Sequence, residues 1–155
     1  MNIELRTIDE TNRGAVELLE VAHSQRQFIA SNKASLKTAQ AEEYKDVARP
    51  FAIYADDRLI GFTMFAFDLT SDDPDDRYWL WRFMIDRNLQ GNGYGSAALE
   101  TIIAYFRNHG ANHILLSTKD TNTAALSLYH KYLFAETGEM NDDEIVLRLN
   151  LLHSE

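Results

Sequence analysis

A glycine-rich segment lies where an aromatic, apolar run changes into a helical pattern. The segment reads Gln90-Gly91-Asn92-Gly93-Tyr94-Gly95-Ser96. Its three glycines let the backbone approach a ligand closely and turn several N–H groups toward it. The N-terminus of the following helix adds unpaired donors and partial positive charge. The spacing therefore predicts a site for anionic oxygens, and a diphosphate is a group that suits it.

Two common nucleotide-binding loops fit this segment poorly. A dinucleotide-binding loop would place a third glycine at Ser96 and an acidic residue about 20 positions on, whereas Asp120 lies about 29 positions on. A phosphate loop of the nucleotide-triphosphatase kind needs Gly-Lys-Ser or Gly-Lys-Thr, which the segment lacks. A glycine-rich turn without a ligand remains as the structural interpretation.

The elements around the segment predict a β-α-β unit. The aromatic and apolar run Tyr78–Ile85 is typical of a largely buried strand. Apolar residues then recur at helical spacing over residues 97–106, and Gly110 supplies a helix C-cap. The short apolar run His113–Thr118 suits a buried strand parallel to the first.

The rest of the chain predicts alternating strands and helices. Strands are expected at residues 3–8, 51–55, 59–67 and 145–149, with Asp56-Asp57 as the hairpin turn. Helices are expected from about residue 12 to 22, over 33–46 after a cap at Ser31 or Asn32, and over 122–132. This order predicts an α/β fold with one mixed sheet and helices on both faces, in a single domain over residues 1–155.

Composition excludes several classes of function. The chain has no cysteine, so disulfides, thiolate metal sites and a cysteine nucleophile are absent. Its five histidines show no joint metal-ligand spacing, and no metal is expected. The net charge of −9 disfavours nucleic-acid partners and favours a cationic one. The acidic stretch 68–76 is either a solvated loop or a region that steers a cation.

The sequence also bears on location. No apolar segment approaches the roughly 20 residues needed to cross a bilayer, and the N-terminus lacks a basic region followed by an apolar stretch. A cytoplasmic protein without a membrane partner is the default expectation.

Two motifs in order resemble a known superfamily. Gln90-x-x-Gly93-x-Gly95 after an aromatic strand resembles the acetyl-coenzyme A (acetyl-CoA) signature of the GCN5-related N-acetyltransferases (GNAT). The later pattern Asn122-x-x-Ala125-x-x-Leu128-Tyr129-x-x-x-x-Phe134 is similar to that superfamily's cofactor-contacting helix. The resemblance implies a central, mostly antiparallel mixed sheet of about six to seven strands, acetyl-CoA as co-substrate, and frequent dimerisation. Within the superfamily, the stretches 28–36 and 78–86 look like bacterial spermine/spermidine acetyltransferases of the diamine acetyltransferase group.

The resemblance also assigns roles to residues. It implies that the backbone of Phe83, Met84 and Ile85 contacts the pantetheine arm, with an oxyanion donor near Met84 or Ile85. It places the diphosphate over the N–H groups of the glycine-rich segment, namely Gln90, Gly91, Asn92, Gly93, Tyr94, Gly95 and Ser96. Asn122 would contact the cofactor, and Lys131 would reach a cofactor phosphate or be solvated. Tyr129 would protonate the departing thiolate, with core packing as its structural alternative.

The acceptor side is less determined by the sequence. Trp79 and Trp81 are candidates for lining an amine channel, although alternation along a strand would place some of the neighbouring rings in the core. Some polyamine-acetylating relatives carry a Glu at the position of Trp81, so a base must come from elsewhere. Water, Glu42, Glu43 and Asp68 are the candidates. A second departure is Leu133, where the family usually has glycine before Phe134.

These observations predict an N-acetyltransferase that moves acetyl from acetyl-CoA to a primary amine by direct transfer in a ternary complex. Polyamines such as spermine and spermidine are the leading acceptors. Another small-molecule amine or a protein N-terminal amine is the alternative acceptor. A non-catalytic sensor that binds acyl-CoA is the alternative from another class.

Overall fold

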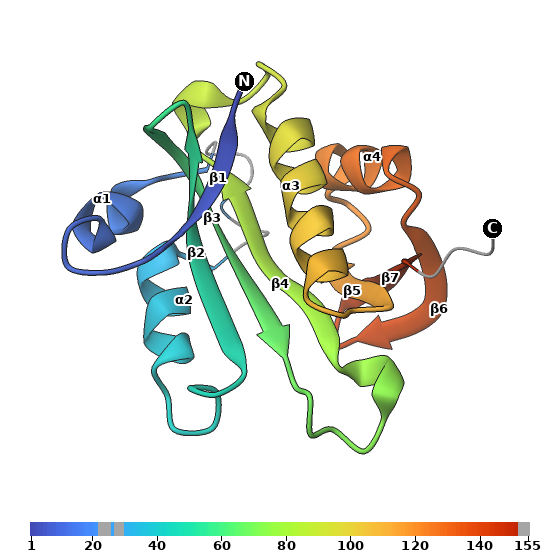
Figure 1. Ribbon diagram of the computed structural model, residues 1–155. Coiled ribbons are helices and arrows are strands. Elements are labelled where there is room, and N and C mark those ends of the chain that lie inside the picture. Colours follow the sequence, from blue (N-terminus) through green and yellow to red (C-terminus); the bar gives the residue numbers. More distant parts are fainter. Residues whose placement is uncertain (22–25, 27–29, 152–155) are drawn as a thin grey trace.

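The computed structural model describes residues 1–21, 26 and 30–151 (Figure 1). Ala22 of the first expected helix lies outside the described residues, as do Phe28 and Ile29 of the stretch that resembles spermine/spermidine acetyltransferases. Two of the five histidines, His23 and His153, also lie outside them. None of the described helices combines the length and the apolar character needed to cross a membrane.

Seven strands form one mixed sheet in the order β1-β2-β3-β4-β5-β7-β6. Neighbouring strands are antiparallel except for the parallel pair of β4 and β5. The strands are β1 (Ile3–Thr7), β2 (Ala48–Ala55), β3 (Arg58–Phe67), β4 (Tyr78–Ile85), β5 (His113–Thr118), β6 (Ala135–Asn141) and β7 (Glu144–Asn150). The predicted mixed, mostly antiparallel sheet of six to seven strands is confirmed.

Helices cover both faces of the sheet, as expected (Figure 1). On one face lie α1 (Arg13–Leu18) and α2 (Asn32–Ala39), whose buried Val16 and Leu36 pack against β3 and β4. On the other face lie α3 (Tyr94–Asn108) and α4 (Thr123–Lys131). Leu99, Ile102 and Phe106 of α3 pack there against a core built from β3, β4, β5 and β7.

The two parallel strands at the centre of the sheet pair over a very short length. Within the described chain, the ladder between β4 and β5 has one register pair, Trp79 with Leu115. On its other side, β4 stays paired with β3 as far as Ile85 opposite Gly61. The second half of β4 therefore keeps one edge of its backbone free of a strand partner, facing β5 and α4.

A β-bulge interrupts β4 in its middle. Leu80 pairs with Phe65 and Arg82 pairs with Met64, so Trp81 is the additional residue on β4. A bulge breaks the strict alternation of side chains between the two faces of a sheet. Trp81 and Arg82 consequently both line the same cavity, described below.

Three elements differ from the sequence-based expectation. The expected helix 33–46 ends at Ala39, and residues 40–47 form successive turns instead. The first expected helix is also short, with Leu18 being 80% exposed at its end. Strand β6 was not predicted, because each of its residues is exposed and its sequence shows no apolar alternation. The predicted turn at Asp56-Asp57 is confirmed by positive φ angles at both residues.

Candidate active site

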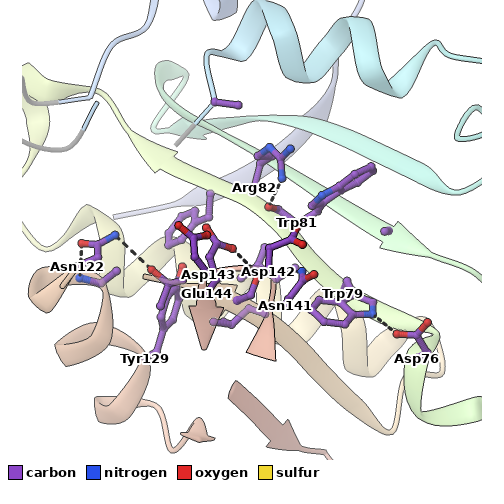
Figure 2. A pocket seen from close by; sticks show the side chains of 18 of the residues that line it. Asp76, Trp79, Trp81, Arg82, Asn122, Tyr129, Asn141, Asp142, Asp143 and Glu144 are labelled. Carbon is purple, nitrogen blue, oxygen red and sulfur yellow. Dashed lines mark hydrogen bonds between the residues drawn. The ribbon is translucent and has the colours of Figure 1, made fainter. Parts of the chain in front are cut away.

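Two cavities meet beside the second half of β4. The larger, of about 550 Å³, lies between β4, the end of β5 and the turn joining β6 to β7 (Figure 2). The smaller, of about 310 Å³, lies between the end of β4, the glycine-rich segment and α4. Phe83, Asn122, Ala125 and Tyr129 line both. A reaction between a ligand in one cavity and a ligand in the other would take place at these four residues.

Along the second half of β4, the backbone N–H and C=O groups of successive residues point alternately toward β3 and toward the smaller cavity. The carbonyl oxygen of Met84 faces β3 closely, since a Cβ added to Gly61 would lie 2.3 Å from it. The N–H of Asp86 donates to the carbonyl of Ile60 on the same side. By strand alternation, the backbone groups of Phe83 and Ile85 face the smaller cavity. The carbonyl of Met84 is directed to β3 and its side chain packs in the core beneath α1 and α2, while Met84 also contributes to the lining of the smaller cavity.

The glycine-rich segment has the backbone conformation that its sequence predicts. Gly91 and Gly93 have φ angles of 81° and 83°, which residues with a Cβ rarely adopt. A Cβ at either position would meet no atom within 4 Å, so conformation and not space requires glycine. Gly93 is the N-cap of α3 and offers no side chain to the N–H groups of its first turn. These donors are therefore left for a ligand.

Neighbouring side chains hold this segment and add charge. Gln90 Nε2 donates to the carbonyl of Ile85 (2.9 Å) and joins the segment to β4. Asn92 Nδ2 donates to the carbonyl of Leu89 (3.2 Å) at the end of the 3₁₀ turn Arg87–Leu89. Lys131 Nζ, from the end of α4, donates to Ser96 Oγ (3.3 Å) and brings an ammonium group to the N-terminus of α3.

The remaining residues of the segment take different positions. Gly95 lines the smaller cavity, together with Gln90 and Gly91. Tyr94 is partly buried and packs against the core cluster beneath β2 and β3. The segment therefore presents mainly backbone groups and small residues to this cavity.

Asn122 and Tyr129 belong to α4 and lie at the junction. Asn122 caps α4, since its Oδ1 accepts from the N–H of Ala125 (3.4 Å), and its Nδ2 donates to Thr118 Oγ1 (3.4 Å). Tyr129 is 9% exposed, and burial raises the pKa of its phenol well above the ordinary value. Among the described residues, none forms a hydrogen bond with its hydroxyl. The phenol is thus a neutral proton donor that is not occupied by another protein group.

The indole rings of Trp79 and Trp81 line the far part of the larger cavity (Figure 2). Trp79 Nε1 donates to Asp76 Oδ1 (2.9 Å), and the ring of Trp81 contacts that of Tyr44 edge-on at 5.0 Å between centroids. Trp79 and Trp81 are two positions apart, so the ordinary alternation of a strand directs both rings to the same face of β4.

Carboxylates dominate the wall of this cavity. The described lining contains one guanidinium, that of Arg82, and five carboxylates: Asp68, Asp76, Asp142, Asp143 and Glu144. Asp68 and Asp76 belong to the acidic stretch recognised in the sequence. The other three, Asp142 and Asp143 in the turn between β6 and β7 and Glu144 at the start of β7, were missed, because a short run of acidic residues is common in solvated turns and β6 was not predicted. Asn141-Asp142-Asp143-Glu144 between two strands is the signal that could have indicated them.

Arg82 is the cation of this wall. Its Nη1 donates to the carbonyl of Trp81 (2.9 Å), and its Nε is buried without a hydrogen-bond partner in the described structure. Burial lowers the pKa of Arg82, and the charge of Glu144 opposes that shift.

Glu42 does not lie among the residues that line either cavity. Its side chain is 88% exposed and forms an ion pair with Lys45 (2.9 Å between Nζ and Oε2). Asp68 is therefore the sequence-predicted carboxylate that the structure brings to the cavity. Within the described ranges, no group of three or more His, Asp and Glu side chains is arranged to hold a metal ion.

Known proteins match the chain in sequence and in structure. The sequence model of the Acetyltransferase (GNAT) family matches residues 15–133. Spermine/spermidine N(1)-acetyltransferase of Bacillus subtilis is 29% identical over 153 residues, which cover 96% of this chain and 99% of that protein.

Solved structures share the fold. The ribosomal-protein-S18-alanine N-acetyltransferase from Escherichia coli superimposes with a TM-score of 0.71 and 19% identity, over 99% of this chain and 97% of that one. A Bacillus subtilis acetyltransferase in complex with CoA superimposes with a TM-score of 0.67 and 20% identity, over 97% and 99% of the two chains. With the family match over most of its length, the chain belongs to the GNAT family of acetyltransferases.

Proposed function

We propose that this acetyltransferase transfers acetyl from acetyl-CoA to a primary amine of a polyamine, with spermine and spermidine as the leading acceptors. The observation that carries the proposal is the wall of five carboxylates in a cavity that ends at Tyr129. Carboxylates attract ammonium groups, and a linear polyamine carries several of them. The 29% identity to a spermine/spermidine acetyltransferase over nearly the whole chain supports the same acceptor.

The cofactor would occupy the smaller cavity. Its diphosphate would accept hydrogen bonds from the uncapped N–H groups at the start of α3, beside the ammonium of Lys131. Its pantetheine arm would lie along the free edge of β4, where the backbone of Phe83 and Ile85 can pair with amide groups. The thioester would then lie at the junction between Phe83, Asn122 and Tyr129.

The acceptor would extend through the larger cavity. Its distal ammonium groups would lie among Asp68, Asp76 and the indole rings, where each cation–π contact contributes about 0.5 to 2 kcal/mol. Its reacting nitrogen, in the neutral form, would reach the thioester carbonyl at the junction. Because the two ligands enter from different cavities, acetyl can pass directly between them without an acetyl-enzyme intermediate.

Tyr129 would complete the transfer. When the tetrahedral intermediate collapses, the carbon–sulfur bond breaks and the thiolate needs a proton. The phenol of Tyr129 is protonated at neutral pH, so it can supply that proton. A backbone N–H of Phe83 or Ile85 would stabilise the oxyanion, since these two face the smaller cavity.

One assay tests the acceptor and the reaction together. Purified protein is incubated with acetyl-CoA and either spermine, spermidine, a diamine, lysine or a peptide with a free N-terminus, and both CoA release and product mass are measured. Acetylated spermine or spermidine, formed far above the rate without amine, is the expected result. Acetylation of the peptide or of lysine alone would move the proposal to another amine class. Binding of acetyl-CoA without any acetylated product would favour a sensor.

A further inference from the structure

We propose that Glu144 is the proton acceptor for the attacking nitrogen. The inference rests on the proposed acetyl transfer to an amine and assigns a role that the sequence left open. Position 81 of β4, where some relatives carry a Glu, holds Trp81 in this chain. A carboxylate that serves the reacting nitrogen must therefore come from another element.

The sheet register places Glu144 at the level of the junction. Trp79 pairs with Leu115 in the parallel ladder, and the bulge at Trp81 leaves two ladder steps between Trp79 and Arg82, so Arg82 lies at about the height of Ser117 and Phe83 at about the height of Thr118. Thr118 pairs in turn with Ile145 of β7, next to Glu144. Thr118 also accepts a hydrogen bond from Asn122, which lines both cavities. Glu144 is thus beside the point where the two cavities meet.

A hydrogen bond fixes the direction of this carboxylate. Ser117 pairs with Val146, and Glu144 lies two residues from Val146 on the same face of the sheet. Ser117 Oγ donates to Glu144 Oε1 at 2.7 Å, and Glu144 lines the larger cavity. One oxygen is occupied by Ser117, and the other is available to a ligand.

The charges around Glu144 fit this role. The charge of Glu144 acts on Arg82 of β4, where it opposes the lowering of the pKa of Arg82 by burial. Asp143 forms an ion pair with Lys119 (3.5 Å between Oδ2 and Nζ). Asp68 and Asp76 lie toward the start of β4, next to Trp79. Of the five carboxylates, Glu144 is therefore the one that a hydrogen bond holds at the junction.

The step balances with groups already described. The neutral amine attacks the thioester carbon, a carbon–nitrogen bond forms, and the nitrogen becomes positively charged. Glu144 takes one proton from that nitrogen. The carbon–sulfur bond then breaks, and the thiolate takes the proton of the Tyr129 phenol. The proton on Glu144 returns through water to the Tyr129 phenolate, which restores both groups and leaves the amide and CoA.

The test separates proton transfer from the attraction of cations. Glu144→Gln keeps the hydrogen bond with Ser117 but cannot accept a proton. We expect its kcat to fall about 100-fold, with the KM for the amine changed less than about threefold. Asp143→Asn in the adjoining turn should instead raise KM and leave kcat nearly unchanged. Glu139→Gln on the exposed strand β6, outside both cavities, should match the wild type.

Rescue with an external base makes the test sharper. In Glu144→Ala, added formate can accept the proton in place of the missing carboxylate, so it should restore part of kcat in proportion to the formate concentration. Formate should not affect Glu139→Gln. Circular dichroism and acetyl-CoA binding verify that each variant is folded. A kcat of Glu144→Gln within about threefold of the wild type, or a change in KM alone, would overturn the assignment.

The proposed acceptor and the proposed base can fail separately. If the wild type acetylates an amine other than a polyamine, the same variants are measured with that amine, and the kcat of Glu144→Gln still decides the role. If the wild type acetylates no amine, both proposals are wrong.

Discussion

Tyr129 combines a position at the junction of two cavities with an environment that keeps its phenol protonated. Burial raises the pKa of the phenol, so it stays a neutral donor through the neutral and moderately alkaline range. Its only ring contact in the described structure is with Phe134, at 5.6 Å between centroids. Packing alone would thus be preserved by phenylalanine, whereas proton donation would not.

Tyr129→Phe is expected to lower kcat about 100-fold at saturating substrates while acetyl-CoA binding stays unchanged. Steady-state kinetics and calorimetric titration of the cofactor check this. Tyr132→Phe is the matched control, because Tyr132 lies on the same helix end and bonds Glu100 instead of lining a cavity. An undiminished kcat in Tyr129→Phe would show that the thiolate is protonated by another group.

His113 makes folding stability depend on pH. The side chain is 1% exposed on β5, its Nδ1 contacts Asn112 Oδ1 (2.6 Å), and its Nε2 is buried without a partner in the described structure. Burial and then the charge of Arg148 lower the pKa of His113 below 6.5, while Asp73 and Asp75 oppose them. Below pH 6.5 the unfolded chain therefore binds a proton that the folded chain resists, and stability falls as pH decreases.

The melting temperature is accordingly expected to decrease between pH 7.5 and pH 5.5, and to decrease less in His113→Gln. Differential scanning calorimetry at several pH values measures this slope. His109→Gln, at an exposed position after α3, controls for the loss of an imidazole. An equal slope in His113→Gln and in the wild type would contradict the prediction.

At the scale of elements, periodicity predicted the parts of the chain that bury apolar residues. The central strand and β5 were predicted because each is a short apolar run typical of a buried strand, and α3 was predicted because its apolar residues recur at helical spacing. Strand β6 was not predicted because an exposed edge strand buries neither face and therefore shows no apolar pattern in the sequence. The β-bulge escaped for another reason: it depends on pairing with β3, which is separated from β4 by a long connection.

The site residues likewise divide into those with local sequence signals and those that only strand pairing brings together. The glycine-rich segment and α4 carry local signals of conformation and capping, so their residues could be predicted before the fold was known. The carboxylates of residues 142–144 are functional candidates only because β7 pairs with β5, a contact between distant parts of the chain. Similarly, the choice between Phe83, Met84 and Ile85 required knowledge of which edge of β4 is unpaired.

The glycine-rich segment allows a prediction with an internal control. Gly93→Ala must place a Cβ on a residue with a φ of 83°, at a cost of about 1 kcal/mol, and should raise the KM for acetyl-CoA several-fold. Gly14→Ala is the control, because Gly14 lies within α1 without positive φ and a Cβ there meets no atom within 4 Å. It should leave KM unchanged and not lower stability. Chemical denaturation and initial rates give both quantities, and an unchanged KM in Gly93→Ala would contradict the role of the segment.

At the scale of the whole molecule, a net charge of −9 coincides with a cavity lined by acidic residues. Fields of this kind raise the rate at which oppositely charged ligands arrive, and salt screens them with a Debye length of about 10 Å at 0.1 M. The kcat/KM for spermine should thus fall as ionic strength rises from about 0.05 to about 0.5 M. A monoamine acceptor should show a shallower dependence. Equal slopes for both amines would exclude long-range attraction as a source of specificity.

The unpaired edge of β4 has a consequence for how such a protein can evolve. A cofactor that is held mainly by main-chain groups of β4 and of the glycine-rich segment depends little on which side chains those positions carry. Four of the five carboxylates, including the Trp79 partner Asp76, lie instead on two surface connections, between β3 and β4 and between β6 and β7. Mutational drift in these connections would change the accepted amine while the donor half of the site persists, so lineages with this scaffold can exchange substrates without passing through an inactive ancestor.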